Sequence, residues 1–396
     1  MVEFYKKKLS NGLTVLFEKR NLPVVSVSAT VNWGSEFETE KIKGVSHFIE
    51  HLMFKGTKTR GQKEIAEEIE RKGGVLNAYT SEEVTSYWNK LPSKHVVDGI
   101  NIASDLILNP KFDAVEFERE KGVIIEEIKM YHDNPHYYVM DRIKQMLYDK
   151  PFGSSIAGKA ETIKNAKRED IMKLFNSMYT TDSMVLCVVG NADFNEICKT
   201  AEKLYPKTKR KFIPQPIKKI HTEVVEKRKE LEQAHFTFGF HAPTFSEKLR
   251  YAYDIAGCHL FDGMASVLFQ EIREKRGLAY AIKGGFDQSK NYGFGTIYVN
   301  TLKEKIKTVK EIIIKELADL KNLNQKDFEE CKEQLIGSKK VAEEDSSNVM
   351  NNLMLEEISG NAEDYYKYES NIHKVKLEDI KNIRIKNYST FSLVPE

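Results

Sequence analysis

Two histidines and a glutamate stand close together in the segment His47-Phe48-Ile49-Glu50-His51. On a helix that turns about 100° per residue, the two histidines fall about 40° apart and one turn along, and Glu50 lies on the same side. Neutral imidazoles at positions i and i+4 can share a zinc ion, and a nearby carboxylate that does not bind the metal can take a proton from its water. These residue types at this spacing predict a metal site with a general base.

The alternative for this segment is the solvated polar face of a surface helix. The residues around the histidines are apolar, however, namely Phe48, Ile49, Leu52, Met53 and Phe54. Unpaired histidine and glutamate side chains on such a buried helix would cost free energy, whereas a metal ion would satisfy them. The apolar surroundings therefore favour the metal site.

A catalytic zinc site has three protein ligands and leaves a fourth position for water, so one ligand must come from another segment. The segment from Asp113 to Met130 has helical periodicity and is rich in glutamate. Glu120 and Glu127 lie two turns apart on an apolar stripe, where a carboxylate needs a cation. Periodicity alone leaves Glu120, Glu126 and Glu127 open as the ligand, and any one of these glutamates taken alone is more often a solvated helix residue.

Strands and helices alternate through the first half of the chain. Asn11-Gly12 favours the positive φ of a tight hairpin turn, and Gly73-Gly74 is typical of a helix C-cap. The periodicity predicts strands ending at residue 9 and over 13–17, 24–31, 75–80, 85–91 and 184–189, and helices over 45–54, 62–72, 95–108, 113–130, 137–147 and 168–178. This pattern predicts a mostly antiparallel sheet backed by helices.

The same order of elements starts again in the second half, which indicates an internal duplication. The expected strands are 223–226, 235–241, 281–286, 293–299 and 391–394, and the expected helices are 248–260, 264–275, 306–323, 326–341 and 377–387. Three prolines and a run of basic residues between Tyr205 and Lys219 predict an exposed linker, which we place at 206–216. We therefore expect an α+β protein of two homologous repeats, residues 1–205 and 217–396.

Composition excludes several classes of partner. Lys+Arg 61 against Asp+Glu 59 leaves a net charge of +2, which gives no general attraction to nucleic acid or anionic lipid. The chain has neither an apolar run of membrane-spanning length nor the apolar core of a signal peptide at its start. Its four cysteines lack C-x-x-C spacing, which is typical of buried thiols in a reducing compartment. We expect a cytoplasmic protein without nucleic-acid or membrane partners.

The motif H-x-x-E-H is that of the inverted zincins, and a second segment strengthens the match. The sequence FEREKGVIIEE, residues 117–127, resembles the second signature of the pitrilysin and mitochondrial processing peptidase family. This resemblance implies that Glu127 is the third zinc ligand, that Glu120 supports the site and that Glu50 is the base. It also implies one zinc ion per chain, because the second half contains no H-x-x-E-H.

Two further segments resemble parts of the same family that hold substrate. GGVLNAYT, residues 73–80, is similar to the family's edge strand, which implies that Asn77 and Ala78 bind substrate backbone by strand addition. Residues 268–280 resemble the segment that carries an arginine and a tyrosine seven residues apart, although the helix start lacks the family's small, Ser-Arg-rich residues. That assigns Arg273 and Tyr280 as hydrogen-bond donors to a substrate carbonyl. Without the family, Asn77 would be an ordinary strand residue, Arg273 a surface residue and Tyr280 a core residue.

The resemblance implies a zinc-dependent endopeptidase of half length that cleaves peptides or unfolded polypeptide segments. Because the family's full-length relatives enclose substrate between two such units, it also implies a homodimer, or a heterodimer with a related chain, in which Arg273 and Tyr280 reach the partner's zinc. One rival is a non-catalytic structural or substrate-holding subunit, which could lose a ligand or the base, whereas this chain keeps both. Another is a peptide-binding module with structural zinc, which would need four protein ligands where three are found.

Overall fold

The computed structural model describes residues 2–210 and 215–396, and the chain begins with the hairpin that Asn11-Gly12 predicts. Strands β1 (Glu3–Lys8) and β2 (Thr14–Lys19) pair antiparallel on either side of this turn. Gly12 has a φ of 99°, which an L side chain rarely adopts. The Asn11 side chain accepts a hydrogen bond of 3.1 Å from the backbone N–H of Leu13. The Asn11-Gly12 turn thus brings β1 and β2 together as the first hairpin of the sheet.

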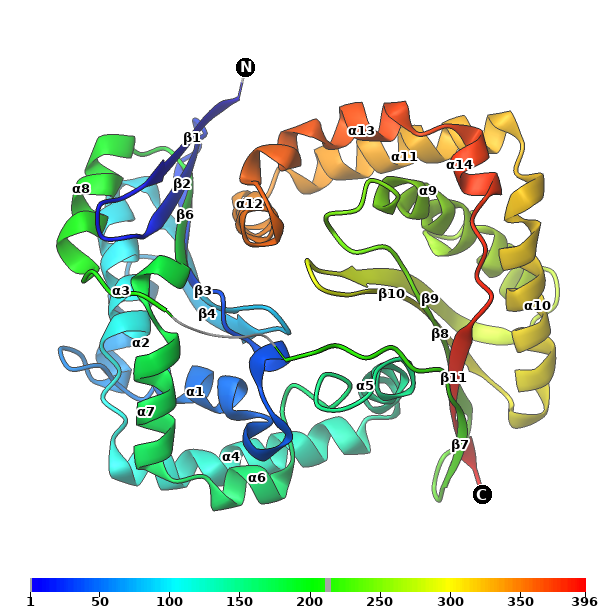
Figure 1. Ribbon diagram of the computed structural model, residues 1–396, viewed down its shortest axis with the longest axis horizontal. Coiled ribbons are helices and arrows are strands. Elements are labelled where there is room, and N and C mark those ends of the chain that lie inside the picture. Colours follow the sequence, from blue (N-terminus) through cyan, green and yellow to red (C-terminus); the bar gives the residue numbers. More distant parts are fainter. Residues whose placement is uncertain (1, 211–214) are drawn as a thin grey trace. The chain divides into compact units, whose positions relative to one another are not determined.

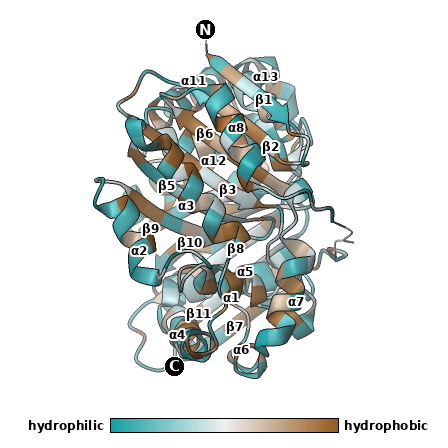
Figure 2. Cartoon of the chain, turned by 90° about the vertical axis from the view of Figure 1, so that its left-hand side faces the viewer, coloured by the Kyte–Doolittle hydropathy of each residue, from teal (hydrophilic) through white to brown (hydrophobic). Residues whose placement is uncertain are grey.

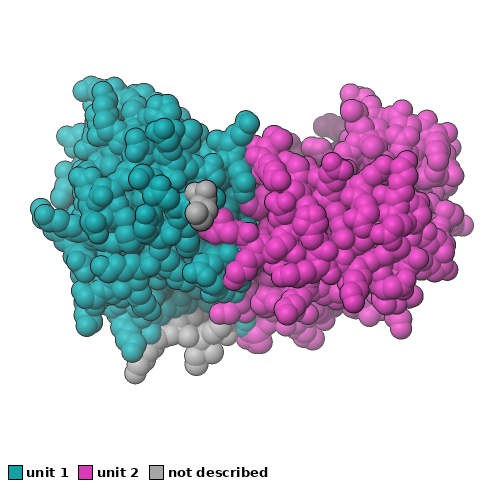
Figure 3. Space-filling view, turned by 90° about the horizontal axis from the view of Figure 1, so that it is seen from above, with its two compact units in different colours: residues 1–129, 155–215, 342–365 teal, residues 130–154, 216–341, 366–396 magenta. Residues whose placement is uncertain are grey.

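Two compact units are built from segments that alternate along the chain (Figure 3). Unit 1 consists of residues 1–129, 155–215 and 342–365, and unit 2 of residues 130–154, 216–341 and 366–396. The linker expected at 206–216 includes residues 211–214, which lie outside the described residues. The division into domains 1–205 and 217–396 stays a prediction.

Each unit contains one sheet surrounded by helices, the α+β architecture that the periodicity predicts (Figure 1). The sheet of unit 1 has the strand order β1-β2-β6-β3-β5-β4. Its other strands are β3 (Val24–Val31), β4 (Val75–Thr80), β5 (Thr85–Pro92) and β6 (Met184–Gly190). The sheet of unit 2 has the order β7-β11-β8-β10-β9. Its strands are β7 (Glu223–Arg228), β8 (Ala234–His241), β9 (Ala279–Gln288), β10 (Gly293–Thr301) and β11 (Tyr388–Pro395).

The two sheets repeat one topology. The run β2-β6-β3-β5-β4 corresponds strand by strand to β7-β11-β8-β10-β9. In both runs the first two strands are parallel, and every other neighbouring pair is antiparallel. The mostly antiparallel sheets and the duplication expected from the sequence are therefore present in the fold.

Amphipathic helices surround the sheet of unit 1. Hydrophilic and hydrophobic residues occur on the same helix, as on α8, which buries Ile197, Cys198 and Ala201 (Figure 2). The helices are α1 (Val45–Met53), α2 (Gln62–Glu70), α3 (Val96–Leu108), α4 (Ala114–Asp133), α6 (Ala160–Asn165), α7 (Arg168–Met178), α8 (Phe194–Leu204) and α12 (Ser346–Ser359). Of these, α4 begins in unit 1 and ends in unit 2.

Each sheet is also covered by a helix from the other half of the sequence. Helix α5 (Pro135–Leu147) packs on β8 and β11 in unit 2, whereas α12 packs on the equivalent strands β3 and β6 in unit 1. The remaining helices of unit 2 are α9 (Arg250–Phe261), a π-helix (Phe269–Glu274), α10 (Ile306–Asp319), α11 (Gln325–Ala342), α13 (Tyr368–Lys374) and α14 (Leu377–Lys381). The duplication thus includes a reciprocal exchange of one helix.

The bounds predicted from the sequence are wrong for two helices. The helix expected over 264–275 is a π-helix from Phe269 to Glu274, preceded by a turn after Gly263, whose φ is 80°. The helix expected over 377–387 ends at Lys381, because the following residues alternate between buried and exposed as the chain runs toward β11. Helices α6, α8, α12 and α13 were not predicted from the periodicity.

The cores and the cysteines agree with the composition. Each unit has its own hydrophobic cluster, centred on residues such as Leu186 and Val27 in unit 1 and Phe238 and Ile313 in unit 2. All four cysteines are buried and free. Among the described residues, no helix combines the length and the apolar character needed to cross a membrane.

Candidate metal centre

Helix α1 carries the H-x-x-E-H residues and is fixed at both its start and its apolar face. Gly44 precedes it with a φ of 97°. The buried carboxylate of Glu38 accepts hydrogen bonds from the backbone N–H groups of Gly44 at 2.9 Å and Ser46 at 2.5 Å. A carboxylate at this end is favoured by the helix dipole. Phe48 and Ile49 are fully buried, and each contributes about 1.5–3 kcal/mol through the hydrophobic effect.

His47, His51 and Glu127 converge, the last from α4. Oε2 of Glu127 lies 3.7 Å from Nε2 of His47 and 3.2 Å from Nε2 of His51. One ligand atom from each residue lies within 4.8 Å of the other two, and no other group of this kind occurs among the described residues. Zinc binds such atoms at about 2.0–2.2 Å, so neighbouring ligands of a tetrahedral site lie about 3.3–3.5 Å apart. Two imidazole nitrogens and a carboxylate at these separations fit a zinc ion.

Glu120 lies behind His51 rather than among the three converging residues. Its Oε2 is 3.2 Å from Nδ1 of His51, and its Oε1 is 2.8 Å from Nζ of Lys55. The third glutamate left open by periodicity, Glu126, is exposed and pairs with Lys129 at 2.8 Å. Among the three candidates, Glu127 alone faces both histidine Nε2 atoms.

Glu50 lies beside this cluster, and a residue of the sheet of unit 1 donates a hydrogen bond to its carboxylate. The hydroxyl of Thr80, the last residue of β4, donates a hydrogen bond of 2.6 Å to Oε2 of Glu50. Burial raises the pKa of the Glu50 carboxyl, while the Thr80 hydrogen bond and the charge of His51 oppose the rise. A carboxylate with a raised pKa is a better proton acceptor near neutral pH.

The two histidines differ in protonation. Burial, together with the charge of His51, lowers the pKa of His47 to about 4. Burial would lower the pKa of His51 as well, but its hydrogen bonds to Glu120 and Glu127 outweigh burial and raise it to about 9. In the metal-free cluster these shifts favour the neutral form of His47 and the protonated form of His51, and a divalent cation bound there would displace the proton of His51.

The strand beside the cluster is an edge of the sheet. β4 pairs with β5 on one side and has no strand on the other among the described residues. Asn77 is exposed, and its Oδ1 accepts a hydrogen bond of 2.8 Å from the N–H of Ala78. An edge strand offers backbone groups with which an extended peptide can pair. Asn77 and Ala78 thus occupy a position where strand addition is possible.

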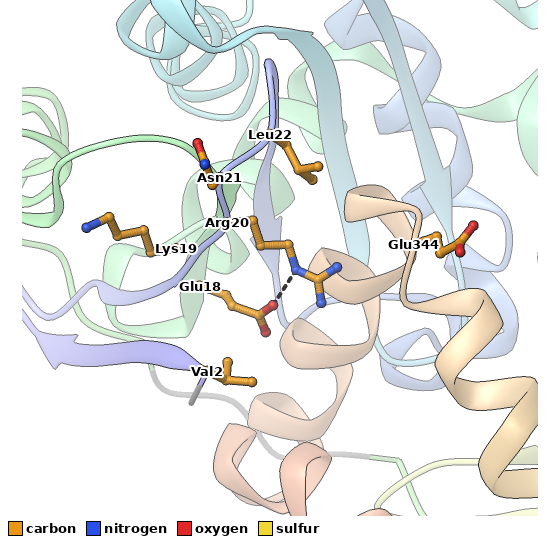
Figure 4. A pocket seen from close by; sticks show the side chains of 7 residues that line it. All are labelled: Val2, Glu18, Lys19, Arg20, Asn21, Leu22 and Glu344. Atoms are coloured by element: carbon orange, nitrogen blue, oxygen red, sulfur yellow. Dashed lines mark hydrogen bonds and ion pairs between the residues drawn. The ribbon is translucent and has the colours of Figure 1, made fainter.

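A separate pocket of about 460 Å³ in unit 1 contains none of these residues (Figure 4). It is lined by Val2, Glu18, Lys19, Arg20, Asn21, Leu22 and Glu344. Nε of Arg20 donates a hydrogen bond of 2.5 Å to Glu18, so the two charges satisfy one another. No function is assigned to this pocket.

Comparison with known proteins agrees with this geometry. A sequence profile described as "Insulinase (Peptidase family M16)" matches residues 14–160, and one described as "Peptidase M16 inactive domain" matches residues 165–335. The chain belongs to peptidase family M16. The resemblance to the pitrilysin and mitochondrial processing peptidase family is thereby confirmed.

Individual M16 proteins are similar over most or half of the chain. An "uncharacterized zinc protease" of Bacillus subtilis, YmxG, is 33% identical over 346 residues, covering 86% of this chain and 84% of that protein. The mitochondrial-processing peptidase subunit beta of Blastocladiella emersonii is 38% identical over 202 residues, covering 50% of this chain and 43% of that protein. A protease structure from Helicobacter pylori has a TM-score of 0.94 at 21% identity, with both chains covered completely. This last match shows a common fold.

The arginine and tyrosine suggested by the M16 resemblance lie next to each other in unit 2. Arg273 belongs to the π-helix and Tyr280 to β9, and Cζ of Arg273 is 5.2 Å from the centre of the Tyr280 ring. Tyr280 is 76% exposed, so it is not a core residue. The two side chains form an accessible pair of hydrogen-bond donors.

Sequence reasoning missed three residues that support this M16 site. Lys55 follows His51 by four residues, and that spacing could have drawn attention to it. Thr80 ends the strand that carries Asn77, but no local signal connects it with Glu50. Glu38 precedes the helix by several residues, outside the usual N-cap position, so the capping pattern did not reveal it.

Proposed function

We propose that this chain is a zinc-dependent endopeptidase that cleaves peptides or unfolded polypeptide segments. The observation that carries the proposal is the convergence of His47, His51 and Glu127 next to Glu50, in a chain of family M16. Zinc held by these three residues would lower the pKa of a water molecule and polarise the peptide carbonyl.

Other residues of the chain transfer the proton and bind the substrate in the proposed reaction. Glu50 accepts a proton from the attacking water at its carboxylate and returns it to the leaving amine, as a general base and then a general acid. Thr80 holds that carboxylate in place. Asn77 and Ala78 bind the substrate backbone along β4, which restricts substrates to extended segments.

Arg273 and Tyr280 complete the proposed site from a second chain. Their donor groups would bind the substrate carbonyl oxygen as negative charge develops on it. The proposed partner is an identical chain, or alternatively a related one, whose zinc faces this pair. A cytoplasmic location stays a prediction.

The alternative function is a non-catalytic subunit that holds substrate. The match of residues 165–335 to a profile named for an inactive domain supports this alternative. The first half, however, retains the two histidines, the third carboxylate and the base, which a purely structural subunit would not need.

Zinc analysis and peptide cleavage on the purified chain test the proposal. We expect about one zinc ion per chain, hydrolysis of an unstructured fluorogenic peptide, and loss of hydrolysis on treatment with a chelator. Glu50→Gln should keep zinc and the fold but lower hydrolysis by about 10²–10⁴-fold, the range typical for a general base. A chain that binds zinc and peptide without cleaving any of a varied peptide set would favour the non-catalytic alternative.

A further inference from the structure

Lys55 contacts the metal centre through one intermediate residue. Its Nζ lies 2.8 Å from Oε1 of Glu120, and the other oxygen of that carboxylate lies 3.2 Å from Nδ1 of His51. The side chain of Lys55 is 21% exposed and that of Glu120 only 2%. The three side chains form a continuous row that ends at the ring expected to bind zinc.

The Glu120 carboxylate needs both of its partners. A buried carboxylate costs free energy unless it is paired and hydrogen-bonded. A charge-assisted bond from an ammonium group is stronger than a neutral one, so the bond to Lys55 favours one orientation of the Glu120 carboxylate. With Oε1 bound by Lys55, Oε2 is directed at His51, and Nε2 of the same ring is directed at Glu127.

The backbone next to Lys55 is also fixed. Lys55 is the second residue after α1, and the loop beyond it is fastened to the buried side chain of Asp105. Oδ2 of Asp105 accepts hydrogen bonds from Thr57 at 2.6 Å, Thr59 at 2.8 Å and Arg60 at 2.8 Å. These bonds fix the loop that follows Lys55, and the backbone N–H of Lys55 donates a hydrogen bond of 3.1 Å to the carbonyl of Leu52, so the backbone from which the lysine side chain extends is held in place.

We propose that Lys55 is a positioning residue for the metal centre, which acts through Glu120 to hold the His51 ring with Nε2 toward Glu127. The inference rests on the proposed zinc function. Outer partners that orient a ligating histidine typically change metal affinity by about 10–100-fold when removed. His47 has no such support, since its Nδ1 is buried without a hydrogen-bond partner among the described residues. His51 is therefore the ligand whose orientation depends on Lys55 and Glu120.

Zinc affinity of the full chain, measured by competition with a chromogenic chelator, tests the role without relying on activity. Lys55→Met keeps the apolar stem but removes the donor, and we expect the zinc Kd to rise about 10–100-fold. Lys55→Arg can still donate to Glu120 and should stay within about threefold of the wild type. Lys58→Met removes an exposed lysine of the same loop and serves as the matched control, with unchanged affinity expected.

A double-mutant cycle separates this role from a general effect on folding. If Lys55 acts through Glu120, Lys55→Met should have little further effect on zinc affinity in a Glu120→Gln background. A purely structural role would weaken binding equally in both backgrounds, and that result would overturn the proposal. Thermal unfolding of the metal-free variants checks the fold. If Lys55→Met does not fold, Lys55→Leu, which also lacks a donor, is compared with Lys55→Arg, and equal affinity of these two would likewise overturn it.

The outcomes also separate this inference from the proposed function. A wild-type chain that binds no zinc would contradict the proposed function itself. A wild-type chain that binds zinc and cleaves peptide, together with a Lys55→Met variant of equal zinc affinity, would contradict only the role of Lys55.

Discussion

The hydroxyl of Thr80 donates a hydrogen bond of 2.6 Å to Oε2 of Glu50 and thereby joins the edge strand β4 to the glutamate on α1. The strand proposed to bind substrate and the residue proposed to move the proton are thus in direct contact. A shift of β4 on binding an extended peptide would be transmitted to the carboxylate through this hydrogen bond.

Loss of this bond should slow cleavage without loss of zinc. A hydrogen bond to a charged group contributes about 1.5–3 kcal/mol, so we expect Thr80→Val to lower kcat about 10–100-fold. Thr80→Ser keeps the hydroxyl and should recover most of the rate. Zinc content measured alongside should equal that of the wild type, and a fall in zinc instead of rate would assign Thr80 to the metal centre.

The two buried-face glutamates of α4 should differ in their effect on zinc. Glu127→Gln replaces a carboxylate ligand with a much poorer amide ligand and should remove most of the zinc. Glu120→Gln should still reach full occupancy at saturating zinc, with weaker affinity, because Glu120 contacts the metal centre only through His51. Elemental analysis after dialysis, and again at saturating zinc, distinguishes the two. Equal zinc in Glu127→Gln and wild type would contradict the ligand assignment.

A composite active site predicts complementation between two inactive chains. Glu50→Gln and Arg273→Ala should each cleave poorly as separate homodimers. After mixing, a heterodimer contains one site that pairs an intact Glu50 from one chain with an intact Arg273 from the other, so activity should recover in part. Native mass spectrometry confirms subunit exchange. Exchange without recovery would mean that Arg273 acts within its own chain or has no role in cleavage.

Unit 2 should lose stability in mild acid through His241. The pKa of this histidine is lowered to about 4, mainly by burial and also by nearby Lys219 and His221, while a weak hydrogen bond to the carbonyl of Ile220 opposes the shift. An unfolded histidine has a pKa of about 6.5, so between these values the unfolded state binds a proton that the folded state does not. The stabilisation is present above pH 6.5 and is lost as the pH falls toward 4, at up to about 1.4 kcal/mol per pH unit.

His241→Phe removes this titration and keeps a ring against Tyr148, whose centre lies 4.9 Å from that of His241. The free energy of unfolding, measured in urea from pH 7 to pH 4, should therefore fall less steeply in the variant. His373→Gln replaces an exposed histidine and should follow the wild type. Identical slopes for His241→Phe and wild type would show that His241 does not limit stability in acid.

Several parts of the molecule follow from local sequence. The side chains of His47, Glu50 and His51 share one side of α1 because a helix repeats every 3.6 residues, whatever surrounds it. Asn11-Gly12 fixes the first hairpin because few residues tolerate its backbone angles. The repeated order of strands and helices predicted the duplicated α+β fold because hydrophobic periodicity reports which face of each element is buried.

Tertiary structure decided what periodicity could not. The spacing of Glu120 and Glu127 predicted that both lie on the same stripe of α4. Only the packing of α4 against α1 places Glu127 next to the histidine Nε2 atoms and Glu120 next to Nδ1 of His51. The bonds from Lys55 to Glu120 and from Thr80 to Glu50 join residues that are 65 and 30 positions apart in the sequence. A sequence pattern describes one element at a time, whereas contacts of this kind depend on how two elements meet. The positions of α5 and α12, each on the sheet of the other half, also depend on tertiary structure, because the apolar face of a helix does not specify which sheet it packs against.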